Sequence, residues 1–450
     1  MSEADTTALA GWGRTAATRA SILRPTDAAA GERLLDGPTP GRALGFRGLG
    51  RSYGDAAQSA GGAVIETTGM TAVLDLDRDA GIVRAEAGLS IDALLRAVVP
   101  AGWFVPVTPG TRQVTLGGAV AADVHGKNHH RDGAFGSHVL ALRLATPDGV
   151  PQEVGPGTPL FDATVGGMGL TGFISEVTLQ LIPVTSSSMR VETVRTTDLD
   201  ATMDALATQD VRARYSVAWL DCISTGRSLG RGVITSGDHA DRSELTGSSR
   251  TEPLTFSPMT RLRAPDIVPA GLLNRTSVRA FNEAWFRRAP ARPRTTIEHA
   301  ATFFHPLDGV ADWNRIYGPS GFVQYQYVVP DGQERTVAES VRILAEAGAA
   351  SFLAVLKRFG PQGPGMLSFP MAGWTLALDL PVRPGLAPLL ARLDALVLEA
   401  GGRLYLAKDS RMPREMLEAG YPRLEEFRAL RATVDPQSRL ATDLSRRLGL

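Results

Sequence analysis

The chain has 450 residues, 43% of them hydrophobic, and its 47 Lys and Arg residues balance its 47 Asp and Glu residues. This length predicts two or three domains with an ample core, and the neutral total charge excludes a general attraction to nucleic acid. The single cysteine, Cys222, excludes an internal disulfide and a cysteine-based metal cluster.

The sequence predicts neither a secretion signal in its first residues nor a membrane-spanning helix. Residues 1–10 include acidic side chains and no apolar core of signal-peptide length, so no Sec signal is recognisable. No run approaches the roughly 20 apolar residues of a spanning helix, so any membrane contact is expected to be peripheral.

Residues 48–55 (GLGRSYGD) form the first of two glycine-rich segments. They are not a Rossmann fingerprint, because the third glycine of that motif would fall on Tyr53. Glycines leave backbone N–H groups unobstructed, and such a segment can cradle a pyrophosphate. We expect the guanidinium of Arg51 to add further hydrogen-bond donors for the pyrophosphate.

Residues 81–88 alternate as a short strand, and Ser90 is expected to cap a helix whose apolar side chains share one face. The second glycine-rich segment, residues 109–128, follows. Its glycines allow close approach to phosphate, and Thr111 and Thr115 offer hydroxyls. Two such segments predict one large cofactor that carries a pyrophosphate.

His125, Lys127, His129 and His130 form a dense polar group. Metal binding is disfavoured, because two of the histidines are adjacent and no H-E-x-x-H frame or cysteine accompanies them. A polar wall beside a cofactor, with His125 and Lys127 facing substrate, fits better.

Strands are predicted at residues 139–146 and 172–182, the second preceded by a third glycine cluster at 166–172. A domain boundary follows near residues 183–188. Residues 225–318 are expected to be an irregular insertion whose stretch 261–294 carries eight arginines among apolar residues. Such a stretch can contact a membrane surface or bind an anionic lipid. An irregular insertion exposed to solvent is an equally good interpretation.

The later elements predict a second α+β unit with an antiparallel sheet and helices on one face. Strands are expected at 322–329, 351–357, 374–380 and 403–406, and helices at 335–347 and 385–400. Lys357 and Lys408 stand at strand ends, where desolvation can lower the pKa of an amine and make it a base or a hydroxyl donor.

Three stretches together, residues 47–55, 109–118 and 125–130, resemble the vanillyl-alcohol-oxidase-like FAD-binding family. The resemblance narrows to the oxidase subunits of decaprenylphosphoryl-β-D-ribose 2′-epimerases. That likeness extends in order through residues 9–15, 161–174, 305–308, 313–315, 324–326, 367–370 and 402–410.

The resemblance implies a two-domain α+β oxidase. Its FAD domain would comprise residues 1–186, completed by the C-terminal segment 403–450, and its substrate domain residues 187–402. The implied flavin contacts are Gly48, Leu49, Gly50, Arg51, Ser52, Tyr53, Gly54, Asp55, Ala56, Gly110, Thr115, Leu116, Gly117, Gly118, Ala122, Asp123, Val124, His125, Ile174 and Tyr405. Covalent relatives carry the flavin on a histidine where this chain has Tyr53, so FAD is expected to bind non-covalently.

The implied reaction oxidises the ribose 2′-hydroxyl of decaprenylphosphoryl-β-D-ribose to a ketone. Lys408 would accept the hydroxyl proton, with Tyr53 and His125 as further catalytic residues. The implied substrate contacts are Lys127, Gln326, Lys357, Ala377 and Lys408. Relatives carry a cysteine at the position of Ala377, so a thiol-directed inhibitor would have no target here. Thr375 and Phe304 also depart from the polar and tyrosine side chains that the resemblance implies for contacts with the substrate head.

The resemblance implies the first half of an epimerisation that supplies arabinose for cell-wall arabinan. An NADH-dependent short-chain reductase would complete it, and the protein would be membrane-associated at the cytoplasmic or periplasmic face. Two alternatives stay open: an FAD oxidase of soluble sugars or alditols that uses oxygen, and a flavin-free binding protein.

Overall fold

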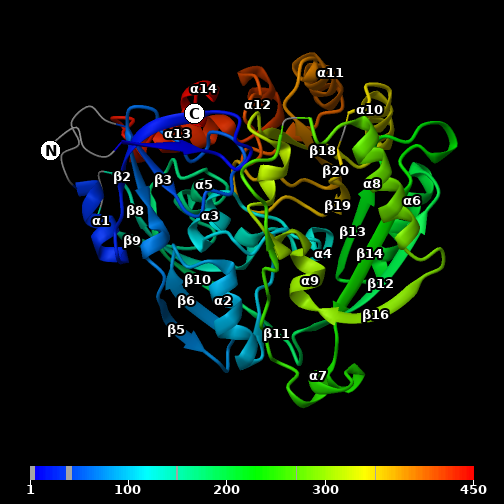
Figure 1. Cartoon of the computed structure of the whole chain (residues 1–450). Coiled ribbons are helices and arrows are strands. Elements are labelled where there is room, and N and C mark those ends of the chain that lie inside the picture. Colours follow the sequence, from blue (N-terminus) through cyan, green and yellow to red (C-terminus); the bar gives the residue numbers. More distant parts are fainter. Residues whose placement is uncertain (1–5, 37–42, 148–149, 270, 350) are drawn as a thin grey trace.

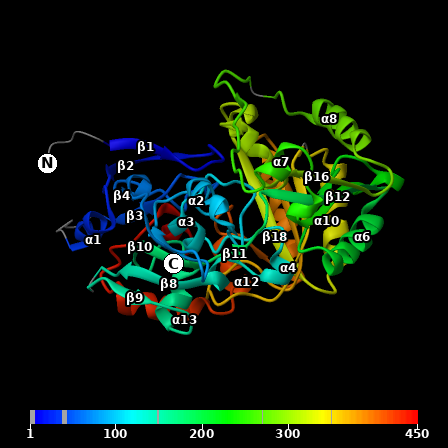
Figure 2. The same cartoon turned by 90° about the horizontal axis from the view of Figure 1, so that it is seen from below.

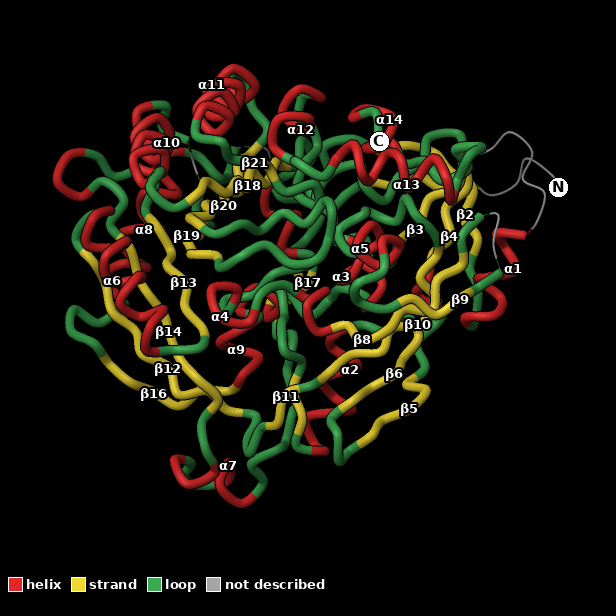
Figure 3. Tube along the Cα trace, turned by 180° about the vertical axis from the view of Figure 1, so that it is seen from behind, coloured by secondary structure: helices red, strands yellow, loops and turns green. Residues whose placement is uncertain are grey.

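The computed structural model describes residues 6–36, 43–147, 150–269, 271–349 and 351–450, which form two lobes joined by a continuous core (Figure 1). The first five residues of the stretch inspected for a signal sequence lie outside the described part. One lobe carries the N-terminal sheets, and the other is built on a single large sheet, as the rear view also shows (Figure 3).

The N-terminal lobe contains two sheets. The first has the order β1 (Thr6–Ala10), β2 (Ala17–Leu23), β4 (Ala63–Glu66) and β3 (Leu44–Arg47), in which β4 runs parallel to both neighbours. The second is antiparallel, with the order β5 (Val73–Asp77), β6 (Ile82–Glu86), β10 (Phe173–Gln180), β8 (Val139–Ala145) and β9 (Gln152–Val154). A short ladder joins β7 (Trp103–Phe104) to β11 (Ile182–Pro183).

Among the described residues, four helices pack in this lobe: α1 (Ala28–Asp36), α2 (Ile91–Val98), α3 (Leu116–Ala121) and α5 (Pro159–Thr164). The short helix α4 (His129–Asp132) contacts strand β19 (Ala354–Phe359) of the second lobe. The prediction for α2 is confirmed. Ser90 accepts a hydrogen bond from the N–H of Ala93 as the N-cap, and the predicted apolar face of α2 is buried.

The second lobe is built on an eight-stranded antiparallel sheet, as predicted for the substrate unit. Its order is β16 (Arg294–His299), β12 (Ser188–Thr196), β14 (Gly232–His239), β13 (Tyr215–Leu220), β19 (Ala354–Phe359), β20 (Gly373–Pro381), β18 (Phe322–Pro330) and β21 (Arg403–Leu404).

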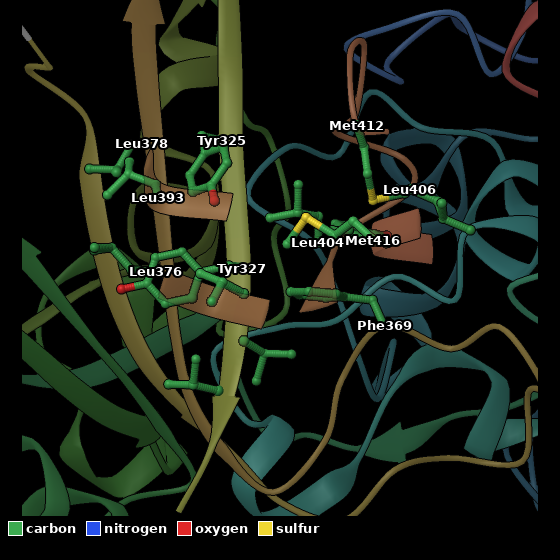
Figure 4. Packing of buried hydrophobic residues seen from close by; sticks show 14 of the residues in the cluster. Tyr325, Tyr327, Phe369, Leu376, Leu378, Leu393, Leu404, Leu406, Met412 and Met416 are labelled. Carbon is green, nitrogen blue, oxygen red and sulfur yellow. The ribbon is translucent and has the colours of Figure 1, made fainter. Parts of the chain in front are cut away.

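Three helices cover one face of this sheet: α6 (Leu199–Arg212), α10 (Glu334–Glu346) and α11 (Leu386–Glu399). Side chains alternate along each strand, so every second residue joins the core beneath these helices. Figure 4 shows Tyr325 and Tyr327 of β18 beside Leu376 and Leu378 of β20 on the side of Leu393 from α11. The intervening residues of β18 and β20 therefore point to the opposite face.

The prediction of an irregular insertion at 225–318 is wrong in part. This stretch contains β14 and β16 of the large sheet, together with α7 (Ser248–Thr251), α8 (Arg275–Arg288) and α9 (Ala300–Phe304), and β15 (Leu262–Arg263) paired in parallel with β17 (Val310–Ala311). The edge strand β16 is largely exposed and polar, so it lacks the apolar alternation that marks a strand. Figure 2 shows α8 far from the β1–β2 hairpin.

The C-terminal segment contacts both lobes through β21, α12 (Arg414–Gly420), α13 (Leu424–Val434) and α14 (Asp443–Leu448). Arg403 and Leu404 extend the large sheet at its edge beside β18. Further on, the N–H of Leu44 donates to the carbonyl of Arg439 at 2.7 Å, and Arg447 forms an ion pair with Asp55 at 2.9 Å. The tail thus returns to the first sheet and the first glycine-rich loop.

Candidate active site

The first glycine-rich loop is held between the second loop and the C-terminal segment. A Cβ on Gly48 would lie 2.2 Å from Oγ1 of Thr115, and a Cβ on Gly54 would lie 1.9 Å from the carbonyl oxygen of Asp409. The N–H of Tyr53 donates to the carbonyl of Ala407 at 3.0 Å. Glycine is required at positions 48 and 54 because neighbouring chain segments leave no room for a side chain.

The two loops differ in the backbone groups that they offer to a ligand. In the first loop, the N–H groups of Leu49, Gly50 and Ser52 have no hydrogen-bond partner among the described residues. In the second, the N–H groups of Leu116 and Gly117 donate to the carbonyls of Leu89 and Ala87 at 2.9 and 2.8 Å. The expectation that both loops expose free N–H groups therefore holds for these three residues of the first loop and is wrong for the start of α3.

The hydroxyls expected to meet phosphate are also engaged within the protein. Thr111 donates to Asp308 at 2.6 Å, and Thr115 caps α3 by accepting from the N–H of Gly118 at 3.2 Å. The guanidinium of Arg51 donates to the carbonyl of Leu49 at 2.6 Å and lies 4.1 Å from the ring centroid of Trp12. These side chains shape the loops in this structure.

The remaining predicted flavin contacts differ in their surroundings. The hydroxyl of Tyr405, just after β21, donates to the carbonyl of Ala122 at 2.7 Å, and Ile174 is buried in β10. Gly110 is exposed, and a Cβ there would meet no atom within 4 Å. Gly110 is thus open to solvent or to a ligand.

Asp123 links the turn after α3 to both lobes. Its backbone has a positive φ of 39°, and its carboxylate accepts from the N–H of Gly136 at 2.8 Å and from the hydroxyl of Ser368. Burial raises its pKa to about 6. The hydrogen bonds to Asp123 hold the turn that presents Val124 and His125.

The large sheet presents polar side chains on the face that its helices leave free. On β18 these are Gln324 and Gln326, which lie opposite Asp379 and Ala377 of β20. Lys357 of β19 lies opposite Thr375 of β20. Alternation thus gathers six site residues from three neighbouring strands, and Ala377 is part-exposed among them.

His125 meets this face from the N-terminal lobe. Its Nε2 lies 3.0 Å from Nε2 of Gln326, which also donates to Thr375 at 3.3 Å. An amide nitrogen only donates, so His125 Nε2 is the acceptor and the proton is on Nδ1. Burial holds the pKa of His125 well below its usual value, and Lys357 lowers it further. Nδ1 is buried without a partner among the described residues, which leaves a donor for a bound group.

Lys408 and Tyr53 lie together at the centre of the site. Nζ of Lys408 lies 3.9 Å from the ring centroid of Tyr53. Burial lowers the pKa of Lys408 to about 7, while Asp379 acts in the opposite direction. Burial raises the pKa of Tyr53 well above its usual value, so the phenol stays protonated. Lys408 is therefore an amine that can take a proton near neutral pH.

The sequence contains three lysines, Lys127, Lys357 and Lys408, and the structure places all of them at this site. Burial lowers the pKa of Lys357 to about 8 and that of Lys127 to about 7. Lys127 donates to the carbonyl of Phe303 and lies 4.1 Å from that residue's ring centroid. Because arginine stays protonated, an amine that loses its proton near neutrality requires lysine.

Sequence reasoning missed Asp379, Gln324 and Tyr317. Nε2 of Gln324 donates to Oδ1 of Asp379 at 2.5 Å, and the hydroxyl of Tyr317 faces Oδ2 at 3.4 Å. Their spacing could have identified Gln324 and Asp379. Each stands two residues from a predicted substrate contact on the same strand, and residues two apart on a strand point to the same face. The scarcity of lysine was a second signal.

The site fits FAD better than a metal. The free N–H groups of the first loop and the unpartnered Nδ1 of His125 are donors suited to an anionic, heteroatom-rich group. Among the described residues, no three His, Cys, Asp or Glu side chains are grouped so that they could hold a metal ion. His129 instead accepts from the N–H of Gly360 at 3.2 Å through Nδ1.

Comparison with known proteins agrees with this geometry. Residues 23–155 match the model of the FAD binding domain. The chain is 41% identical to decaprenylphosphoryl-β-D-ribose oxidase of Mycolicibacterium smegmatis, over 98% of this chain and 97% of that protein. It is 44% identical to an uncharacterized protein of Streptomyces coelicolor, over 80% of this chain and 100% of that protein. An alditol oxidase of a Streptomyces species is 27% identical over 30% of this chain and 32% of that protein.

The fold and the site thus define an FAD-dependent oxidoreductase with a basic, amine-lined substrate site. Because the likeness to the mycolicibacterial protein spans nearly the whole of both chains, the chain belongs to the family of decaprenylphosphoryl-β-D-ribose oxidases.

Proposed function

We propose that this protein oxidises the 2′-hydroxyl of decaprenylphosphoryl-β-D-ribose to the 2′-ketone with FAD. The observation that carries the proposal is the amine of Lys408, whose pKa is lowered to about 7 beside Tyr53 of the first glycine-rich loop. When bound, FAD accepts the hydride from C2′ of the ribose. The chain's own residues must bind the anionic substrate, orient the hydroxyl and remove its proton.

Lys408 is the proton acceptor in this proposal. The O–H bond of the 2′-hydroxyl breaks as an N–H bond forms at Nζ of Lys408, which becomes an ammonium. Gln326 and Thr375 lie on the same sheet face and offer polar groups that can hold the sugar. The substrate's phosphodiester is an anion, and Lys127 and Lys357 supply the compensating charge.

The test is anaerobic reduction of the purified protein by decaprenylphosphoryl-ribose, followed as loss of flavin absorbance. Lys408→Ala should keep its flavin and lose this reduction by about 100-fold or more, because a positioned base contributes about that factor. Lys408→Arg should be equally impaired, because it restores the charge and not the base. Arg392→Ala, on the exposed side of α11, is the control. Normal reduction in the two Lys408 variants would remove Lys408 from the mechanism.

Oxidation of soluble sugars or alditols is the alternative function. The partial likeness to an alditol oxidase favours it, although that likeness covers 30% of this chain. The same assay separates the two functions, because reduction by an alditol and not by the lipid-linked ribose would favour the alternative.

We further propose that the 2′-ketone passes to an NADH-dependent short-chain reductase, which returns it as the arabinose epimer for cell-wall arabinan. The chemistry supports this step, because a ketone needs a second hydride donor to complete an epimerisation. FAD is proposed to bind non-covalently.

We propose peripheral membrane contact, at the cytoplasmic or periplasmic face, through residues 259–267. None of the described helices is long and apolar enough to span a membrane. Met259 is 70% exposed, Leu262 67% and Ile267 87%, with Arg261 and Arg263 between them. The N–H groups of Arg261 and Ala264 donate to the carbonyls of Gly309 and Ala311, and Asp266 forms an ion pair with Arg14 at 2.9 Å. These contacts fix the segment near Trp12 and the first glycine-rich loop, where a lipid tail could leave the site.

Co-sedimentation with vesicles of phosphatidylcholine and phosphatidylglycerol tests this contact. The holoenzyme should bind these vesicles and lose binding in high salt, because its arginines contribute through charge. Ile267→Asp should weaken binding about tenfold, since it removes buried apolar area and adds repulsion. Val211→Asp, at an 85% exposed position on α6, is the matched control. Equal binding by both variants would place the contact elsewhere.

A further inference from the structure

Asp379 is a fully buried carboxyl whose charge no neighbouring cation neutralises by direct contact. Its exposed fraction is 0%, and among the described residues no Lys, Arg or His nitrogen lies within 4.0 Å of it. Its oxygens instead meet Nε2 of Gln324 at 2.5 Å and the hydroxyl of Tyr317 at 3.4 Å. Such a group costs free energy unless hydrogen bonds or a nearby charge compensate it.

The surroundings of Asp379 are rigid. Tyr317 is stacked on Phe322 with ring centroids 4.0 Å apart, and Phe322 packs edge-on against Tyr53 at 5.5 Å. Gln324 and Asp379 are a directly opposed pair of neighbouring antiparallel strands. The carboxyl is therefore fixed on the site face of the sheet by its partners and by the ladder.

Lys408 is the cation whose charge favours the ionised form of this carboxyl. Its Nζ lies over the ring of Tyr53, whose other neighbours include Phe322 from the strand of Gln324. The like charge of Lys357 helps to lower the pKa of Lys408, and the charge of Lys408 in turn helps to hold the pKa of His125 below its usual value. Asp379 is thus the acidic group that can balance an ammonium at Lys408, because Asp409 is already paired with Arg447 at 2.8 Å.

We propose that Asp379 is a positioning residue for the base. Held by Gln324 and Tyr317, its carboxylate stabilises the ammonium that forms when Lys408 takes the proton of the substrate hydroxyl. No proton leaves the pair in that step: the proton moves from the hydroxyl oxygen to Nζ, and the positive charge that appears is balanced by Asp379. Asp379 is buried and the site is partly desolvated, so this balance acts through a lower dielectric than that of water and one carboxylate has a sizeable effect. The inference rests on the proposed function.

The direction in which loss of Asp379 changes the pKa of Lys408 follows from the charges of the two groups. Burial lowers the pKa of Lys408 and raises that of Asp379 to about 7, and the opposite charge of each group favours the charged form of the other. Removing the carboxylate must therefore lower the pKa of Lys408 further. The acid limb of the rate of flavin reduction, which follows the free amine, must then move to lower pH, and the plateau must fall because a weaker base remains.

The test compares Asp379→Asn with wild type and with Asp394→Asn, all as holoenzymes. Asp394 is a buried carboxyl of α11 that accepts from Tyr325 at 3.0 Å on the opposite face of the sheet. Trace acylation of lysines with acetic anhydride across a pH series, read by mass spectrometry, gives the pKa of each amine without substrate. The chain's three lysines lie on separable peptides, and Lys127, which does not face Asp379, is an internal reference.

We expect Asp379→Asn to lower the titration midpoint of Lys408 by about one pH unit, with Lys127 unchanged and Asp394→Asn like wild type. The acid limb of anaerobic flavin reduction should shift by the same amount. If Asp379→Asn loses its flavin, Tyr317→Phe must show a smaller shift in the same direction, because it removes one stabilising donor. An unchanged Lys408 midpoint would overturn the proposal. Wild-type protein that the lipid-linked ribose does not reduce would instead refute the proposed function, and the acylation profile would still decide the role of Asp379.

Discussion

Tyr53 illustrates how burial determines the chemistry of a single side chain. The family resemblance implies a flavin-binding histidine at its position in covalent relatives, and its phenol has a pKa well above the usual value because it is desolvated. A protonated phenol is a poor nucleophile, and its ring is covered by Lys408 on one side. The other nearby candidate, His125, has Nε2 occupied by Gln326.

We therefore expect acid precipitation of the purified protein to release its flavin completely into the supernatant. The absorbance of supernatant and pellet measures this directly. A covalent relative treated in parallel should keep a yellow pellet. Flavin retained on this protein after denaturation would show that a covalent bond forms despite the substitution.

At the scale of elements, the site depends on how closely the first glycine-rich loop approaches the segment after β21. The two meet at Gly54 and Asp409, where a Cβ would lie 1.9 Å from a carbonyl oxygen. The loop is also tied by the ion pair of Asp55 with Arg447. Lys408 stands between Asp409 and Ala407, whose carbonyl accepts from the N–H of Tyr53, so its position relative to Tyr53 depends on this approach.

Gly54→Ala should destabilise the protein by about 1–3 kcal/mol, the usual range for forcing an extra methyl group into packed structure. Gly110→Ala is the matched control in the other loop, because a Cβ there meets nothing within 4 Å. Urea unfolding of both variants measures the difference. Equal free energies of unfolding for the two variants would mean that the first glycine-rich loop and the C-terminal segment can move apart without destabilising the protein.

At the scale of the whole molecule, all three lysines lie in one partly desolvated site. The remaining side chains that carry a permanent positive charge are arginines. This distribution predicts an unusual dependence of stability on pH. The pKa values of Lys127, Lys357 and Lys408 are about 7, 8 and 7 in the folded protein, below the ordinary value of about 10.4 that they regain on unfolding. Between these limits the unfolded chain binds more protons, so stability rises with pH.

We expect the free energy of unfolding to increase from pH 7 to pH 9, by up to about 1.4 kcal/mol per pH unit for each lysine that has lost its proton. Urea titrations of the holoenzyme at pH 7, 8 and 9 measure this change. Lys357→Met should reduce the slope, because one titrating amine is gone. The series stops at pH 9 because burial also raises the pKa of the Cys222 thiol, which opposes the trend above that value. A flat or falling stability would contradict the lowered lysine pKa values.

Much of the fold followed from local patterns in the sequence. Ser90 and the apolar spacing after it predicted α2, and the long apolar strands β18 and β20 and the helices α10 and α11 were located to within a residue or two. The edge strand β16 was missed, because an exposed edge has no buried face to impose alternation.

The sequence by itself determined the chemistry that this protein carries: glycines where loops must approach closely, three lysines among a large excess of arginines, and the ordered motifs of the oxidase family. Only the tertiary structure decided which groups remain available. The fold engages the N–H groups at the start of α3 and leaves three N–H groups of the first loop without a partner among the described residues. It also sets Asp379 opposite Gln324 in a site with Lys408. Local patterns report the preferences of neighbouring residues, whereas burial and charge coupling depend on segments hundreds of residues apart, which meet only when the chain folds.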